Sequence, residues 1–326
     1  MKAIQFIDRP VHIPRSFYDE AVDHLIRNCS MLPGLLSIYR FGTVNAPGIS
    51  DLDILFVFEE GAYCPMNGLE SLPDKFGPLF THGIMAMSEN AFEDNFRFSI
   101  WSKADCIWGK QLTCPEERPE HDQLILDRQT AVEFLMANYI DFMVQSSYGV
   151  FKLRSFLQHM KGLAYDMDLL NMNDSPLHPL ISTLRELTIH WFDYTPSDER
   201  IRDWIESFSA VFPIVADEIL QNHPLMLPES DSGNYTIASN MLLKPGEKVG
   251  FSHDGWQLPV AFSFLGKSYF KLLHRTNRFL FTCPVYHQQR GFLADRFQFL
   301  QRMKAYNREH VPRFMTMTPS INAKLI

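Results

Sequence analysis

The stretch FGTVNAPGISDLDILFVF, residues 41–58, combines a Gly-Thr pair, a Pro-Gly turn and two aspartates with a run of apolar residues. Asp51 and Asp53 are separated only by Leu52 and directly precede the apolar run. Two carboxylates this close repel one another unless a cation neutralises them. Side chains alternate along a strand, so both aspartates are expected to point one way while Leu52 and Ile54 face the core. The pattern predicts either two solvated aspartates or a metal site.

The residues around this stretch predict a small mixed sheet with helices. A capping box of Ser16 and Asp19 predicts a helix that ends near Cys29. Further along the chain we expect strands over residues 35–41 and 54–58, a weak helix over 66–76 and a third strand over 80–88.

After about Arg128 the pattern becomes helical, and the fold class predicted for the whole chain is α+β. A long helical stretch over 131–170, broken near 146–149, is followed by helices over 180–192 and 198–220. A Pro-rich linker over 222–234 leads to a β-hairpin region and to a basic helix over 290–310. These elements predict a sheet domain over 1–125, a helical domain over 126–222, and a C-terminal α/β extension over 223–326 whose role is unknown.

Hard carboxylate oxygens at Asp51 and Asp53 suit Mg²⁺ or Mn²⁺, which proteins commonly hold with one or two carboxylates plus substrate phosphates. Upstream, Gly42 lets the backbone approach a ligand closely, and Thr43 adds a hydroxyl beside amides that can hold phosphate oxygens. The two halves predict an anion cradle beside a metal clamp.

The motifs FGT (41–43) and SDLDIL (50–55) resemble the signature of the polymerase-β-like nucleotidyltransferase superfamily. That signature is a hydrophobic residue, Gly, Ser or Thr, a spacer, and then Asp-x-Asp or Asp-x-Glu before an apolar strand. ADCIWGKQL (104–112) is similar to a segment that antibiotic-type and minimal members place after the third strand, and the resemblance covers about residues 16–115. It implies transfer of a nucleoside monophosphate from a nucleoside triphosphate to an acceptor hydroxyl, with release of pyrophosphate. Gly42, Thr43 and Ser50 would then bind the nucleotide.

The family normally supplies a third carboxylate from the third strand, and residues 80–88 contain no acid. Glu89, just past that strand, and His82, as a base, are the candidate replacements. If the third position is vacant instead, the chain is a catalytically inactive nucleotidyltransferase-like protein that binds nucleotide, RNA or a partner protein.

Arg154 and Lys161 are seven residues apart in the second domain and are expected to share a helical face. Together they could hold a triphosphate, because both side chains bind phosphate oxygens. A solvated helix face is the alternative interpretation.

The charge distribution points to a possible anionic partner. Residues 267–326 contain 11 Lys and Arg against two acidic residues, although the whole chain has a net charge of −8. Within this end, a helix would align four cations beside two aromatic residues, namely Lys267, Lys271, Arg275, Arg278, Tyr269 and Phe270. The segment predicts contact with RNA or another polyanion, unless it forms strands or pairs with the chain's own acidic face. The acidic remainder instead fits a small cationic acceptor such as an aminoglycoside.

Composition places the chain among globular proteins, with 46% hydrophobic and 21% charged residues. Its five cysteines are scattered and its N-terminus lacks the features of a signal peptide, which predicts a reducing, cytoplasmic setting. No apolar run is long enough to cross a bilayer, so no membrane partner is expected.

Overall fold

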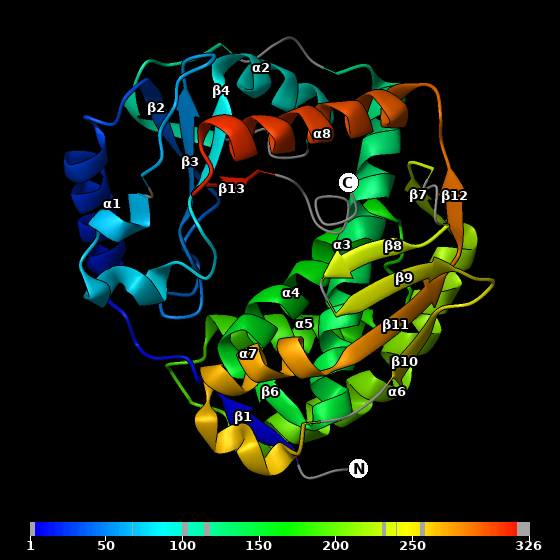
Figure 1. Ribbon diagram of the computed structural model, residues 1–326. Helices are drawn as coiled ribbons and strands as arrows, with labels where there is room; N and C mark the ends of the chain where they lie inside the picture. The colour runs from blue at the N-terminus through cyan, green and yellow to red at the C-terminus, as the bar shows by residue number, and fades with distance from the viewer. Residues whose placement is uncertain are drawn as a thin grey trace. The chain divides into compact units, whose positions relative to one another are not determined.

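The computed structural model describes residues 4–66, 68–99, 104–113, 118–229, 233–238, 240–254 and 258–317. Helices and mixed sheets alternate along the chain, which confirms the α+β fold class (Figure 1). The described chain forms two compact units: one comprises residues 4–10 and 127–291, the other residues 11–126 and 292–317. These units cut across the three predicted segments, because the last part of the chain returns to the first sheet.

The unit that contains the Gly-Thr and Asp-x-Asp motifs is built on a five-stranded sheet in the order β13-β4-β3-β2-β5. Its strands are β2 (Leu35–Phe41), β3 (Asp53–Phe58), β4 (Met85–Ser88), β5 (Ala104–Gly109) and β13 (Met315–Thr316). Strand β2 pairs antiparallel with both β3 and β5, whereas β4 runs parallel to β3 and β13 parallel to β4. The sheet is therefore mixed, as predicted.

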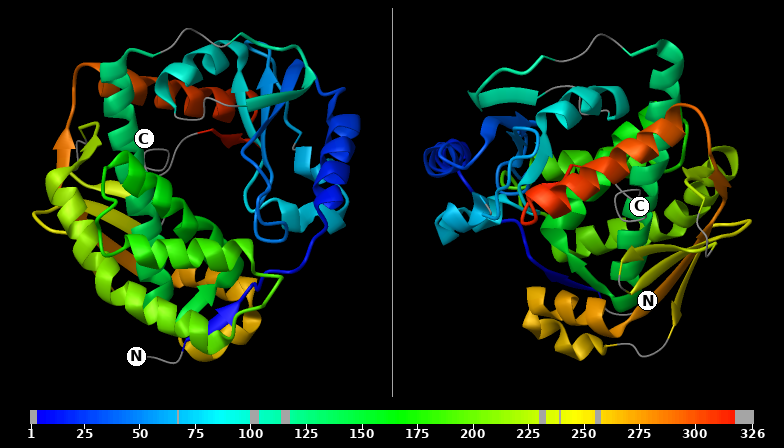
Figure 2. Two further views of the ribbon diagram at one scale, coloured as in Figure 1. Left: turned by 180° about the vertical axis from the view of Figure 1, so that it is seen from behind. Right: turned by 45° about the horizontal axis from the view of Figure 1, so that its top comes forward.

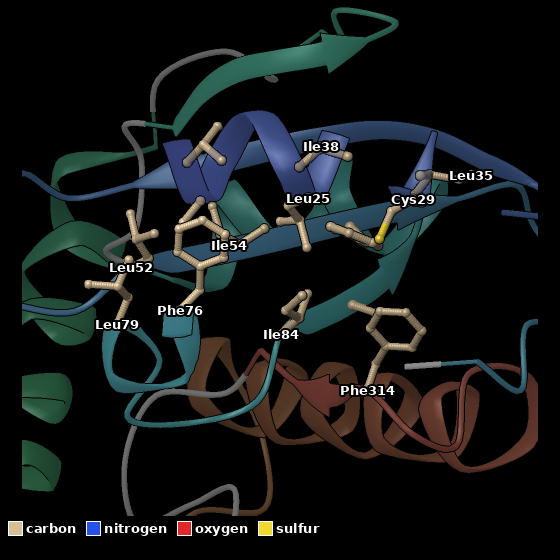
Figure 3. Packing of buried hydrophobic residues seen from close by; sticks show 14 of the residues in the cluster. Leu25, Cys29, Leu35, Ile38, Leu52, Ile54, Phe76, Leu79, Ile84 and Phe314 are labelled. Carbon is tan, nitrogen blue, oxygen red and sulfur yellow. The ribbon is translucent and has the colours of Figure 1, made fainter. Parts of the chain in front are cut away.

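One face of this sheet packs on helix α1 (Arg15–Cys29) and on the 3₁₀ turns η1 (Gly68–Ser71) and η2 (Asp74–Leu79). Figure 3 shows Leu52 and Ile54 in this core together with Phe76 and Leu79. Leu52 and Ile54 are at most 2% exposed, which confirms that they face the core. Helix α2 (Glu89–Phe98) covers the other face, where the ring of Phe92 lies 4.6 Å from that of Tyr39.

Three local predictions differ from the structure. Helix α1 begins at Arg15, one residue before Ser16, and Pro14 is its N-cap residue. The proline ring fixes φ near the value that helices use, and the Pro14 carbonyl accepts from the N–H of Phe17. The weak helix over 66–76 is instead η1 and η2, which lie on either side of Pro73. The third strand starts only at Met85, so residues 81–84 are irregular.

Helix α8 (Phe292–His310) and β13 complete the first sheet from the far end of the sequence. Figures 1 and 2 show α8 alongside α2 and the β4 edge. The Asn307 amide donates to the carbonyl oxygens of Ala86 and Met315, and the ring of Phe314 lies 5.5 Å from those of Phe56 and Phe58. The predicted basic helix over 290–310 is confirmed, and its role is to support this sheet.

The other unit is mainly helical. Its helices are α3 (Glu120–Tyr148, which starts in the unit of the five-stranded sheet), α4 (Leu153–Leu169), α5 (His178–Ile189), α6 (Asp198–Asn222) and α7 (Lys267–Thr276). Strands β1 (Gln5–Ile7) and β6 (Val150–Lys152) pair with each other, as do β7 (Leu225–Leu227) and β12 (Val285–His287). A four-stranded sheet contains β8 (Tyr235–Ala238), β9 (Met241–Pro245), β10 (Gly250–Asp254) and β11 (Arg278–Cys283). The predicted break near 146–149 is confirmed. In the predicted hairpin region β8 and β9 pair antiparallel, whereas β11 lies between β9 and β10.

The predicted row of four cations on one helix is wrong. Helix α7 ends at Thr276, because the amide of buried Asn277 binds the carbonyl of Leu273 and starts an extended backbone. Arg278 therefore belongs to β11. Tyr269 is fully buried and not available for stacking, while the side chains of Lys267 and Phe270 lie outside the described residues. Among the described residues, no helix is long and apolar enough to cross a membrane.

We expect Phe314→Ala to lower the free energy of unfolding of the unit that contains the five-stranded sheet by about 3 kcal/mol, because it removes a buried ring from the core beside Phe56 and Phe58. Denaturant unfolding followed by fluorescence and circular dichroism measures the change. Met31→Ala, at a side chain that is 88% exposed, is the control and should leave stability unchanged. Equal stability of Phe314→Ala and wild type would contradict the role given to the C-terminal segment.

Candidate metal-binding site

Asp51 and Asp53 lie where β3 begins. Asp53 is the first residue of β3 and pairs with Phe41, the last residue of β2, so the Gly-Thr turn follows directly beside it. The Asp51 side chain is 7% exposed and that of Asp53 is 22% exposed. Since Leu52 between them faces the core, both carboxylates emerge on the same side, as the alternation predicts.

His82 completes the cluster from the segment before β4. Its Nε2 lies 2.8 Å from Oδ1 of Asp53 and 3.8 Å from Oδ2 of Asp51, and its Nδ1 lies 2.8 Å from the carbonyl oxygen of Gly83. The Thr81 hydroxyl donates to Asp51. One ligand atom from each of Asp51, Asp53 and His82 lies within 4.8 Å of the other two. The three side chains therefore converge closely enough to share one ion.

The charge of His82 follows from this geometry. Its hydrogen bond to Asp53 is the main reason that the pKa of His82 rises to about 9, with further support from the Gly83 carbonyl and the charge of Asp51, while burial opposes the shift. Without a metal, the imidazolium is thus a cation beside the two aspartates at neutral pH, and it offsets one of their two negative charges.

The loop between the two motifs is fixed by a buried tyrosine. The Tyr18 hydroxyl donates to the carbonyl of Ser50 and accepts from the N–H of Gly48. Ser50 is 5% exposed and its hydroxyl accepts from the N–H of Ala46, so this predicted nucleotide ligand supports the loop from inside.

Gly42 and Thr43 are exposed next to the carboxylates. Gly42 has a φ of +65°, which glycine adopts without strain, and a Cβ at this position would lie 3.8 Å from Oδ2 of Asp53. The predicted anion cradle and the predicted metal clamp are therefore adjacent in the structure.

Glu89 does not join the cluster, which corrects its assignment as a third acid. Strands β3 and β4 are parallel and Phe58 pairs with Ser88, so Glu89 follows the opposite end of the strands from Asp53. Its carboxylate lies 2.6 Å from the ammonium of Lys110 instead. The same register brings His82 and Thr81, which precede Met85, to the aspartate end.

Arg154 and Lys161 both lie on α4, as predicted, but in the other compact unit. Arg154 is only 8% exposed, which leaves little of its guanidinium open to a ligand, and Lys161 is half-buried. Their contact with a triphosphate stays a prediction.

Sequence reasoning missed the contacts that hold the cluster in place. Thr81 could have been found as a hydroxyl adjacent to His82, and Gly83 as a carbonyl that fixes the ring. Nothing in the local sequence connects Tyr18 to the loop 32 residues away.

Comparisons of the chain with protein-family models, with curated proteins and with solved structures found no match. The nucleotidyltransferase resemblance therefore rests on the sequence motifs alone. Two carboxylates and an imidazole form a donor set that fits a divalent cation.

The raised pKa of His82 predicts a pH-dependent stability in metal-free buffer with a chelator present. A folded pKa near 9 against about 6.5 when unfolded gives a stabilisation of about 3 kcal/mol that is complete below pH 6.5 and is lost as the pH rises through 9. The difference in unfolding free energy between wild type and His82→Gln should shrink over this range. NMR titration of the His82 ring gives the pKa directly, and Asp53→Asn should lower it; a ring that titrates near 6.5 in wild type would contradict the geometry.

Proposed function

We propose that this protein is a metal-dependent nucleotidyltransferase that moves a nucleoside monophosphate from a nucleoside triphosphate to an acceptor hydroxyl and releases pyrophosphate. The observation that carries the proposal is the Gly42–Thr43 turn lying directly against Asp53, with Asp51 and His82 converging on the same point. An exposed turn for phosphate oxygens next to a divalent-cation site is what binding of a triphosphate requires.

Each residue has a defined part in this proposal. Asp51 and Asp53 would hold the cation, and Thr81 keeps the Asp51 carboxylate in place through its hydroxyl. The exposed Gly42–Thr43 backbone would bind phosphate oxygens, and the Tyr18 hydroxyl holds the adjoining loop in the required shape. A bound Mg²⁺ or Mn²⁺ supplies positive charge where phosphate negative charge develops. Such catalysis is mostly positioning and electrostatics, which a site of this size can provide.

A second candidate function is binding without turnover. The observation that favours it is the His82 imidazolium, which binds Asp53, offsets one of the two negative charges and can stand in for the cation. A protein of this kind would bind a nucleotide, RNA or a partner and form no product. Incubation with each α-labelled triphosphate, Mg²⁺ or Mn²⁺ and a cell extract distinguishes the two functions, since only an enzyme yields a labelled acceptor.

We expect Asp51→Asn and Asp53→Asn each to reduce nucleotide transfer at least about a hundredfold, because each removes a negative ligand while keeping the side-chain shape. The metal-dependent rise in melting temperature with triphosphate should disappear in both variants. Circular dichroism checks that the fold is retained.

Asp105→Asn is the matched control, because this β5 aspartate has a 75% exposed side chain and lies outside the cluster. It should behave as wild type. Full turnover in Asp51→Asn or Asp53→Asn would exclude the metal-clamp assignment.

The acceptor is proposed to be either a small cationic compound or RNA. The described cations of the predicted basic face that remain together on α7 are Lys271 and Arg275, both exposed and one helical turn apart. Phe262 and Phe264 on η3 (Val260–Leu265), immediately before α7, are 43% and 77% exposed and replace buried Tyr269 as the available aromatic rings. Exposed cations and exposed rings on adjoining elements suit single-stranded nucleic acid.

If RNA is the acceptor, Lys271→Glu combined with Arg275→Glu should weaken binding of a single-stranded RNA at least about tenfold and reduce the dependence of affinity on salt. Fluorescence anisotropy at several salt concentrations measures both. Arg185→Glu combined with Arg200→Glu makes the same change in net charge at exposed positions on other helices and is the control. RNA binding that is absent at low salt, or equal in both double variants, favours a small cationic acceptor.

A further inference from the structure

We propose that His82 is a metal ligand through Nε2, in place of the base assigned to it by sequence, and that the site consequently favours a first-row transition dication over Mg²⁺. The inference rests on the proposed function only in placing the cation at Asp51 and Asp53. It concerns which ion that site selects and which atom selects it.

The first support is the ring's orientation. Nδ1 lies 2.8 Å from the carbonyl oxygen of Gly83, and a carbonyl only accepts, so Nδ1 carries a hydrogen and donates. In the neutral imidazole this leaves the lone pair on Nε2, the atom that faces both carboxylates. Donation from the second ring nitrogen to a backbone carbonyl is how proteins fix the tautomer of a metal-binding histidine.

The second support is the arrangement of the three donors. Nε2 is 2.8 Å from Asp53 and 3.8 Å from Asp51, so a single ion bound to the two carboxylates is also within reach of the ring. The three side chains come from residues at or just before the starts of two neighbouring parallel strands. Thr81 holds the Asp51 carboxylate, and the Gly83 carbonyl holds the ring through Nδ1. The ring's partner changes from a carboxylate to the ion, with the proton on Nε2 released to solvent.

The third support is donor chemistry. Mg²⁺ prefers oxygen ligands and near-ideal octahedral geometry, whereas imidazole nitrogen suits later first-row ions, whose affinity for mixed nitrogen and oxygen sites rises along the series from Mn²⁺ to Co²⁺ and Ni²⁺. Replacing a third carboxylate by a neutral imidazole also makes the ligand set less negative by one charge. Both effects lower the relative affinity for Mg²⁺.

The test measures metal affinity in the intact protein without any turnover. Wild type, His82→Asp and His82→Ala are titrated with Mn²⁺ followed by electron paramagnetic resonance, with Co²⁺ by visible absorption, and with Mg²⁺ by competition against Mn²⁺. Loss of the nitrogen ligand in His82→Ala should weaken Co²⁺ binding at least about tenfold and change Mg²⁺ binding much less. In His82→Asp, which restores a third carboxylate, the preference should shift toward Mg²⁺.

A spectroscopic measurement identifies the ligand atom. Pulsed electron paramagnetic resonance of the Mn²⁺-bound protein should detect a ¹⁴N coupling that disappears in His82→Asp. His121→Asp, at an exposed position at the start of α3, is the control and should keep both the coupling and the metal preference.

Failure of this inference is distinguishable from failure of the proposed function. A Mn²⁺ complex without ¹⁴N coupling, or unchanged Co²⁺ affinity in His82→Ala, overturns the ligand assignment while leaving nucleotide transfer through Asp51 and Asp53 intact. The predicted coupling and preference in a protein that forms no labelled product would instead support the ligand assignment and exclude the transferase. Absence of binding by all three ions would overturn both.

Discussion

The site depends on one constraint, which is that β3 is buried on both of its faces. From Ile54 to Phe58 every side chain of the strand is fully buried, so charged groups have a place only at its two ends, with Asp51 and Asp53 at the start and Glu59 and Glu60 after the end. Because β3 pairs antiparallel with β2 and parallel with β4, the end of β2 and the starts of β3 and β4 lie on the same side of the sheet's strand ends. The exposed turn, the aspartates and the histidine meet there because the pairing leaves them no other position.

The part of the site that depends on alternation along one strand could be predicted from the sequence. Leu52 and Ile54 are core residues, and this alone fixes the side on which Asp51 and Asp53 emerge. The choice between His82 and Glu89 could not be made in this way. It depends on whether the third strand runs parallel to β3 and on where it begins, and both are properties of the whole sheet.

Contacts between residues distant in sequence account for most of the remaining differences. A two-residue strand such as β13 has no detectable pattern, and it exists because Met315 binds the backbone of Ile84 while Phe314 fills the core. The basic end was predicted as a single helical surface from spacing alone. Asn277 interrupts it with a buried side chain that bonds to two segments at once, which spacing does not report.

The unit that contains the five-stranded sheet is built from two stretches of chain that are distant in sequence, and this affects how the protein folds during synthesis. During synthesis the strands β2 to β5 leave the ribosome long before β13 and α8, with residues 127–291 of the other unit in between. Until then β4 is an open sheet edge and the apolar surface that Phe314 will cover is exposed, which is the condition under which nascent chains associate wrongly. The sheet that carries the candidate metal site is thus completed late, and a nascent chain stalled before residue 292 would carry both aspartates on an unfinished sheet.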